Sequence, residues 1–440
     1  MKAAALKYTV LTLAATLAII IIALVPFHAF LTVSLSSVLG YYTELRLWKE
    51  VLLFGTGLAV VYLLLTDHKI RSHTLSRRLI WLIVVYALIH LIVGVISYQN
   101  DDVTLKSLSY GFLVNLRFLI FFMLVWALAL RTSRLKANWQ KLVVWPAIFV
   151  VVFGLLQLTV LPMNFLSNFG YGPSTIEAVE TVNSNDDFVR ISSTLRGPNP
   201  LGAYLIIPIT AILFLLLKAD RKWRLGLLLA GSLIVLAASF SRSGALGALV
   251  SMSLILVLAY REKLSHKVLL SAGGGLLAVL ALAAIIVPNS SYLQNVLFHT
   301  DDASQVATSS NSQRLDAWGG GIADIAEEPF GEGPGSAGPA SVYNNNQVEI
   351  SESYYLQIGQ EVGVLGLAVF LLITAGVGYL LWLRRADPLA LVLFASLVGI
   401  SLVNLLSHAW TDDTLAYIWW GLAGIAMASL PLAATKPDAE

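Results

Sequence analysis

The stretch TVLTLAATLAIIIIALVPFHAF, residues 9–30, contains no charged side chain and is long enough to cross the hydrocarbon core of a bilayer as a helix. It is not an isolated case. The chain has 440 residues, of which 57% are hydrophobic and 12% charged, and its mean hydropathy is +0.77. A soluble globule could not keep that much apolar surface away from water, so lipid must be its solvent.

Runs of comparable length, separated by charged or Gly/Pro-rich breaks, recur along the chain. We predict an all-α polytopic membrane protein with about 12 transmembrane helices, forming a single transmembrane domain over residues 1–440. The first run follows Lys2 and Lys7, is too long for a signal peptide and is expected to remain uncleaved. The runs span residues 9–30, 49–65, 79–96, 108–130, 143–161, 201–217, 225–240, 245–260, 268–287, 355–382, 388–406 and 415–430.

Most of the 28 Lys and Arg residues lie at the termini or in the loops after every second helix. Because short cytoplasmic loops are enriched in basic residues, we expect both termini to be cytoplasmic. Two of the opposite, outer loops are long, at residues 162–200 and 288–353. The second is expected to contain short amphipathic helices, at 291–298 and 312–328. The chain has no cysteine, and nothing in its charge pattern favours nucleic acid.

Eight basic residues do not follow the cytoplasmic pattern, and four of them are arginines on the outer side. These are Arg190, Arg196, Arg242 and Arg314. Because the guanidinium fork binds phosphate oxygens through paired donors, the four predict one anionic ligand, and a lipid-linked pyrophosphate is the anion expected at that depth. Two alternatives stay open. Arginines at helix ends can anchor to lipid headgroups, or they can pair with the acids Glu177, Glu180, Asp186, Asp187 and Asp316.

Several other polar residues are candidates for chemistry. Arg117 is predicted near mid-membrane, where Glu361 is a candidate ion-pair partner, so the two are either structural or functional. Glu352, just before the tenth helix, is either a general base for an acceptor hydroxyl or a helix-start acid. His408, followed by Asp412 and Asp413, is the reserve base. No two histidines have the spacing of metal ligands, so we expect no metal site and no cofactor.

Five strings, in this order, resemble the bacterial O-antigen ligase and O-antigen polymerase superfamily. They are FVRISSTLRGPNPLG at 188–202, SRSGALG at 241–247, SQRLDAW and PFGEGPG within 312–335, and ESYYLQIGQEVGVLG at 352–366. The resemblance implies a metal-independent glycosyltransferase that uses undecaprenyl-diphosphate-linked glycans, with arginines holding the pyrophosphate. Arg190, Arg242 and Glu352 would then be catalytic, and Arg196, Arg314, Asn199, Tyr355 and Arg117 would bind substrate.

The last string departs from the ligase pattern at one position. O-antigen ligases typically have a histidine, then Asn or a similar residue, then Tyr-Leu, whereas this chain has Glu352, Ser353, Tyr355 and Leu356. This places Glu352 at the position of the proposed base. It also means that a polymerase, or a ligase with an acceptor other than lipid A core, is expected at least as much as a typical ligase.

The function expected from the sequence is therefore transfer or polymerisation of an undecaprenyl-diphosphate-linked oligosaccharide onto an acceptor hydroxyl. The partners would be that lipid-linked donor, a glycan or glycolipid acceptor and membrane lipid, and the reaction would take place on the outer face of the bacterial inner membrane. The alternative is a transporter or flippase that recognises the same lipid without breaking a bond, although no duplicated halves are visible in the sequence.

Overall fold

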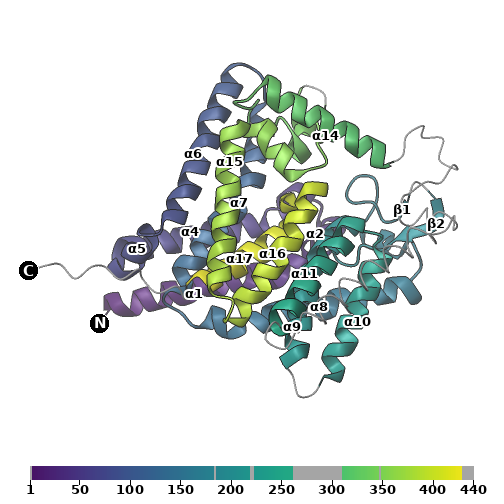
Figure 1. Ribbon diagram of the computed structural model, residues 1–440, viewed down its shortest axis with the longest axis horizontal. Helices are drawn as coiled ribbons and strands as arrows, with labels where there is room; N and C mark the ends of the chain where they lie inside the picture. Colours follow the sequence, from purple (N-terminus) through teal and green to yellow (C-terminus); the bar gives the residue numbers. More distant parts are fainter. Residues whose placement is uncertain (1, 183–184, 219–221, 261–309, 346–347, 429–440) are drawn as a thin grey trace, which may run out of the picture.

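The structure is a computed structural model and describes residues 2–182, 185–218, 222–260, 310–345 and 348–428. Within these residues, nine helical segments are long and apolar enough to cross a membrane, and the helix over Trp223–Ala238 is shorter. Figure 1 shows these helices packed side by side, with one small strand pair at the edge of the bundle. The predicted all-α polytopic membrane fold is confirmed.

The helices of the first half of the chain are α1 (Lys2–Leu24), η1 (Val25–Phe27), α2 (His28–Leu39), α3 (Tyr42–Leu45), α4 (Trp48–Thr66), α5 (His68–Leu75), α6 (Arg78–Gln99), α7 (Leu105–Ala129), α8 (Arg134–Thr159) and η2 (Phe165–Phe169). Of these, α4, α6 and α7 begin within three residues of the predicted runs, whereas α1 and α8 begin seven and nine residues before them, and the shorter helices were not predicted.

The remaining elements follow the strand pair β1 (Glu180–Val182) and β2 (Asn185–Arg190), which the sequence did not predict. They are α9 (Pro198–Lys218), α10 (Trp223–Ala238), α11 (Arg242–Tyr260), α14 (Ser310–Glu327), η4 (Gly338–Tyr343), α15 (Tyr354–Leu383), α16 (Pro388–Leu406), η5 (Ala409–Thr411) and α17 (Asp413–Met427). The predicted helices at 268–287 and 291–298 lie outside the described residues, whereas the predicted helix at 312–328 corresponds to α14.

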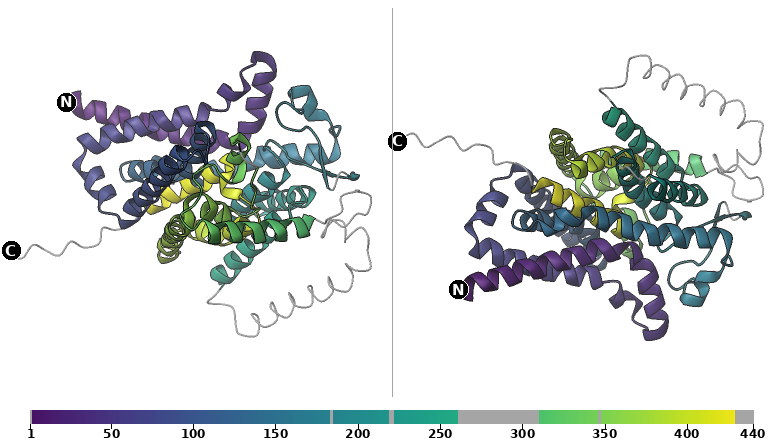
Figure 2. Two further views of the ribbon diagram at one scale, coloured as in Figure 1. Left: turned by 90° about the horizontal axis from the view of Figure 1, so that it is seen from above. Right: turned by 90° about the horizontal axis from the view of Figure 1, so that it is seen from below.

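The first predicted helix is longer and bent. Pro26 lies in the 3-10 turn η1 that separates α1 from α2, and the helical path continues to Leu39. Proline has no N–H to donate and its ring clashes with the preceding turn, which accounts for the change of direction. Figure 2 shows α1 and α2 meeting at this bend.

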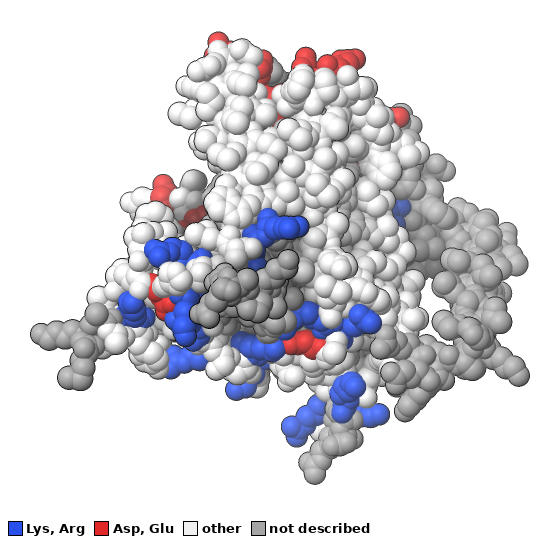
Figure 3. Space-filling model, turned by 60° about the vertical axis from the view of Figure 1, so that its left-hand side comes forward, with Lys and Arg blue, Asp and Glu red and all other residues white. Residues whose placement is uncertain are grey.

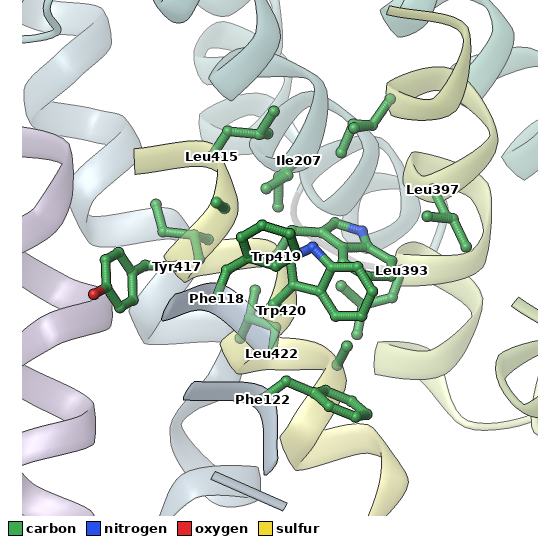
Figure 4. Packing of buried hydrophobic residues seen from close by; sticks show 14 of the residues in the cluster. Phe118, Phe122, Ile207, Leu393, Leu397, Leu415, Tyr417, Trp419, Trp420 and Leu422 are labelled. Carbon is green, nitrogen blue, oxygen red and sulfur yellow. The ribbon is translucent and has the colours of Figure 1, made fainter. Parts of the chain in front are cut away.

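The centre of the bundle is formed by α9 and α17, whose side chains are nearly all buried within the protein. The indoles of Trp419 and Trp420 pack between Phe118 and Phe122 of α7 and Leu393 of α16 (Figure 4). Trp419 Nε1 donates to Ser396 Oγ at 3.1 Å, so the polar edge of this buried ring has a partner. Helix α17 has 15 residues and is apolar on all sides, as expected of a helix surrounded by protein.

Helix α15, expected as one continuous run, is broken at Val362 and Gly363, where φ is −130° and +69°. The break lies against the PFGEGPG segment. The N–H groups of Glu332 and Gly333 donate to the carbonyls of Gln360 and Glu361, both at 2.9 Å, and Val364 N donates to Pro329 O at 3.0 Å. A neighbouring loop therefore supplies the hydrogen bonds that the helix loses, as a break at membrane depth requires.

Charged side chains are unevenly distributed between the two ends of the bundle. Figure 3 shows Lys and Arg gathered along the lower part of one face and Asp and Glu along its upper edge. At the basic end, Arg131 pairs with Asp67 and Lys136 with Asp387, each at 2.6 Å. The loops after α4, α7 and α15 therefore meet at one end, as the alternation of basic loops predicted.

Candidate functional site

A cavity of about 540 Å³ opens at the end of the bundle opposite these ion pairs. Its walls are the first turns of α9 and α11, the residue pair before α15 and the loop that joins α16 to α17. The cavity is lined by Arg190, Arg196, Asn199, Pro200, Ala203, Phe240, Arg242, Ser243, Leu246, Glu352, Leu406, Ser407, His408, Ala409, Thr411 and Asp412. Five of the eight predicted site residues, four of them charged, share this space although they are scattered over more than 160 positions of the chain.

Small residues bring the walls together. A Cβ added to Gly202 of α9 would lie 2.4 Å from Ser241 Cβ, and one added to Gly244 of α11 would lie 2.7 Å from the Gly202 carbonyl carbon. On the next turn, Gly247 and Gly399 bring α11 against α16 in the same way. Small residues at membrane helix crossings permit this close approach. The SRSGALG and RGPNPLG strings are therefore contact surfaces as well as carriers of arginines.

Arg190 ends strand β2 and is directly opposite Glu180 of β1. Its Nε donates to the Ser239 carbonyl at 3.0 Å and its Nη2 to Asn199 Oδ1 at 2.6 Å. Burial lowers the pKa of the Arg190 guanidinium, an effect that the charge of Glu180 opposes. The side chain is thereby held between the α10–α11 turn and the start of α9, with its remaining N–H groups available to a ligand.

Arg196 and Arg242 lie at the N-terminal ends of α9 and α11, whose first turns line the cavity. Arg196 is exposed two residues before α9, and Arg242 is the first residue of α11 and half-buried. Phe240, just before that helix, has a φ of +51°, and Glu352 has a φ of +53°. Left-handed backbone at non-glycine residues is costly and recurs at functional sites, and here it marks two walls of the same cavity.

The segment around Glu352 is tied to the end of α16. Ser353 Oγ donates to the Asn404 carbonyl at 3.2 Å and Tyr354 N to the Ser407 carbonyl at 3.3 Å. Glu352 itself is half-buried and lines the cavity. The carboxylate and the three guanidinium groups therefore face a common space, which is the geometry that a base and an anion site need to act on one substrate.

The sequence predicts His408, followed by Asp412 and Asp413, as a reserve base, and the three residues have different surroundings in the structure. His408 and Asp412 line the cavity. Burial, together with the charge of Arg196, lowers the pKa of His408 to about 4. Burial raises the pKa of Asp412, whose Oδ1 accepts from Thr414 N at 3.0 Å and so caps α17. In the sequence, the polar residues of HAWTDD at 408–413, between two predicted spans, indicate this wall of the cavity.

Three helices, α9, α11 and α17, begin at the cavity, and α15 begins just after Glu352. Each helix N-terminus carries partial positive charge from its aligned peptide dipoles. Their convergence adds to the charge of Arg190, Arg196 and Arg242, so the site favours an anion with several acceptor oxygens. Leu246 and Leu406 supply an apolar edge toward the bundle.

The structure corrects the predicted pairing of Arg117 with Glu361, whereas the contact of Arg117 with substrate stays a prediction. Arg117 is buried and pairs with Asp413 and with Glu50, the latter at 3.3 Å from Nη1 to Oε1. Glu361 instead accepts from Asn115 and from Gly335 N, the second at 3.2 Å. Two polar residues at similar depth on different helices were assumed to meet, but α4 and α17 lie nearer to Arg117.

Arg117 still contacts the wall of the cavity indirectly. Its Nη2 donates to the carbonyl of Thr411 at 2.9 Å, and Lys49 pairs with Asp413 at 2.9 Å. These buried charges therefore hold the loop that carries His408 and Asp412.

The predicted substrate contact Tyr355 lies outside this cavity. Tyr355 lines a separate, mainly apolar cavity of about 480 Å³, with Val250 of α11 and Leu405 of α16. Arg314 lies on α14, which runs beside α15, but its side chain is outside the part of the chain that the structure describes. Among the described residues, no three His, Asp or Glu side chains are grouped so that they could hold a metal ion.

Part of the chain is similar to a known protein family. The sequence model of the O-antigen ligase family matches residues 225–371, from α10 to the second half of α15. The match confirms the resemblance to the O-antigen ligase and polymerase superfamily and includes Arg242 and Glu352, whereas Arg190 and Arg196 precede it. A comparison with curated proteins finds no match. The apolar helices and this family together indicate a bacterial membrane protein with a ligase- or polymerase-like glycosyl transfer activity.

Proposed function

We propose that the protein transfers a glycan from undecaprenyl diphosphate to the hydroxyl of an acceptor, at the outer face of the bacterial cytoplasmic membrane. The observation that carries the proposal is the convergence of Arg190, Arg196 and Arg242 with Glu352 on one cavity. A diphosphate offers the acceptor oxygens and negative charge that the guanidinium groups and helix N-termini favour. The lipid tail would remain in the membrane beside the bundle.

In the proposed reaction, the acceptor oxygen attacks the anomeric carbon of the donor. The bond from that carbon to the diphosphate oxygen breaks, and undecaprenyl diphosphate leaves with the bonding electron pair. Negative charge grows on the leaving diphosphate as the bond stretches, and arginines already in place stabilise it without reorganisation. Glu352 accepts the proton of the acceptor hydroxyl. Glycan, proton and charge are then all accounted for without another reactant.

His408 is the second candidate for the base. With a pKa of about 4, its imidazole is neutral at physiological pH and has a free nitrogen to accept a proton. Its position next to Arg196 also suits a contact with the diphosphate or the sugar. Separate replacement of Glu352 and His408 by glutamine distinguishes the two, because only loss of the base lowers turnover by orders of magnitude.

Placement at the outer face rests on the two ends of α16. The helix begins at Pro388, next to the Asp387–Lys136 pair at the basic end, and ends at Leu406 in the cavity wall. A helix of 19 residues is about 28 Å long at roughly 1.5 Å per residue, which is close to the thickness of the hydrocarbon core. If the basic end is cytoplasmic, the cavity opens to the opposite side.

Purified protein in detergent tests the proposal directly. Incubation with an undecaprenyl-diphosphate oligosaccharide and candidate acceptors, either surface glycans or glycolipids, should release undecaprenyl diphosphate and extend the acceptor. Arg242→Ala should abolish release, whereas Arg71→Ala, which removes an exposed arginine of α5, should not. Movement of the intact lipid across vesicles with no release would contradict transfer and identify a transporter. A ladder of products would indicate a polymerase, and a single addition a ligase.

A further inference from the structure

Three tyrosines from distant parts of the chain meet near the cavity. Tyr42 begins α3, Tyr110 lies on the second turn of α7, and Tyr343 ends η4. The rings of Tyr110 and Tyr343 are 5.4 Å apart and nearly perpendicular. Arg46 lies over the Tyr42 ring at 5.6 Å and Lys106 over the Tyr343 ring at 4.2 Å. We refer to these three rings and two cations as the tyrosine cluster.

Hydrogen bonds hold the residues of the cluster and the elements that carry them in place. Arg46 Nη2 donates to the Tyr110 hydroxyl at 3.3 Å, which links α3 to α7. Thr104 Oγ1 donates to the Tyr343 carbonyl at 2.8 Å and Ser107 Oγ to the Ala340 carbonyl at 2.9 Å, which fix η4 on the first turn of α7. The rings are half-buried, so each keeps an edge or face accessible.

The cluster lies next to the diphosphate cavity. Burial raises the pKa of the Tyr42 phenol, and the charges of Arg46 and Arg196 both oppose that rise. The carbonyl of Arg46 accepts from Lys49 Nζ at 2.8 Å, and Lys49 pairs at 2.9 Å with Asp413, the chain neighbour of the cavity residue Asp412. Tyr42 also packs with Phe169 against Tyr171, in the outer loop at 162–200. The cluster therefore occupies the region between that loop and the η4 segment of the second outer loop.

The chemistry of the cluster suits a saccharide. Tyrosine rings offer a flat apolar face with a polar tip, on which the C–H face of a pyranose can lie while its hydroxyls find partners. The Arg46 guanidinium and the Lys106 ammonium, which lie over one face of Tyr42 and of Tyr343, carry donors for those hydroxyls beside the rings. Tyrosine also loses little conformational entropy when it binds, because it has few rotatable bonds.

We propose that the tyrosine cluster binds the glycan of the lipid-linked donor while Arg190, Arg196 and Arg242 hold its diphosphate. This inference rests on the proposed function and extends it to the saccharide. The two sites are linked through Lys49, which bonds the carbonyl of Arg46 and pairs with Asp413 beside the cavity wall. The reverse reading is that tyrosines and basic residues at a helix end merely anchor the protein among lipid headgroups. That alternative predicts binding that does not depend on the glycan, because the cluster would contact only lipid headgroups.

The test compares two probes on the same variants. Tyr343→Leu removes a ring of the cluster but retains apolar volume, and Tyr379→Leu is the matched control, an exposed tyrosine on the distal half of α15. The probes are undecaprenyl-diphosphate oligosaccharide as the donor and undecaprenyl diphosphate without sugar as an inhibitor. We expect Tyr343→Leu to raise KM for the donor roughly three- to tenfold and to leave the inhibition constant unchanged. Tyr379→Leu should change neither.

An unchanged KM, or a parallel rise of the KM and the inhibition constant, would overturn the assignment. Tyr42→Leu serves as a second variant if Tyr343→Leu does not fold. Failure of the proposed function is seen separately, as wild-type protein that transfers no glycan. In that case, thermal stabilisation by the two probes still tests the cluster, because sugar-dependent stabilisation of the wild type should be lost in Tyr343→Leu. Equal stabilisation of both proteins by the oligosaccharide probe would refute it.

Discussion

Replacement of Arg190 by alanine should cost the protein most of its turnover while leaving the bundle folded. The guanidinium uses two of its N–H groups on the Ser239 carbonyl and Asn199 Oδ1, at 3.0 and 2.6 Å. Neither acceptor carries a formal charge, so these two bonds orient the guanidinium without neutralising it, and only the charge of Glu180 on the opposite strand partly offsets it. Because the residue ends a two-stranded hairpin at the edge of the bundle, its loss leaves the helix core intact.

The size of the effect follows from the role of the charge. Loss of one preorganised donor to a developing oxyanion typically costs about 2.7–4 kcal/mol, which is a factor of roughly 10²–10³ in kcat. Because the leaving diphosphate gains charge only as the bond breaks, kcat should fall more than KM rises. Asn199→Ala keeps the charge and removes only its brace, at a cost of about 1 kcal/mol. Arg190→Lys, with a charge but no fork, should lie between the two.

The assay is release of undecaprenyl diphosphate by purified variants at equal concentration, with circular dichroism and thermal unfolding as folding controls. Arg71→Ala is the matched loss of an arginine far from the cavity. The reasoning would be refuted if Arg190→Ala retained kcat within about threefold of the wild type, or if Asn199→Ala were as damaged as Arg190→Ala.

Three other outcomes are expected. Glu352→Gln should lower kcat by roughly 10²–10⁴-fold with little change in KM, with Glu327→Gln on exposed α14 as control; normal turnover would remove Glu352 as the base. Because burial depresses the pKa of His408 from 6.5 to about 4, the unfolded chain binds more protons between these values, so unfolding at pH 4–6.5 should become easier as pH falls. His408→Gln should flatten that part of a stability profile, and an unchanged slope would contradict the assignment. Gly363→Ala should lower the unfolding temperature, because φ is +69° and a Cβ would lie 2.3 Å from Pro329 O. Gly376→Ala in the same helix is the control and should be tolerated, because its Cβ would meet only Leu79 Cδ1 at 3.5 Å. Equal unfolding temperatures of the two variants would contradict a strained break.

The sequence was sufficient for the membrane class and for most helices because apolar runs of spanning length are rare in soluble domains. It also identified the arginines and Glu352 that line the cavity, since charges on the side away from the basic loops need a specific reason. Short motifs around them were informative for a second reason. In SRSGALG the glycines set the approach of α11 to α9 and α16, so sequence signature and helix contact coincide.

The sequence did not predict the features that depend on which helices are neighbours. Arg117 and Glu361 are both at mid-depth, but their partners belong to α4, α7 and α17, and depth alone does not specify neighbours. The β1–β2 pair was missed because NDDFVR is too short and too polar to read as a strand. Tyr355 follows Glu352 in the motif, yet it lies on the far side of the helix start, next to a different cavity.

The break in α15 has a consequence for the order in which the chain is assembled during synthesis. The carbonyls of Gln360 and Glu361 receive their donors from residues 332 and 333, which leave the ribosome before α15 does. An unpaired peptide group in hydrocarbon costs several kcal/mol, so the broken helix becomes stable only once that earlier segment is beside it. We therefore expect packing of this segment against α15 and insertion of α15 to be coupled steps of biogenesis, and a nascent chain that lost the segment would carry a helix with unpaired carbonyls at its break.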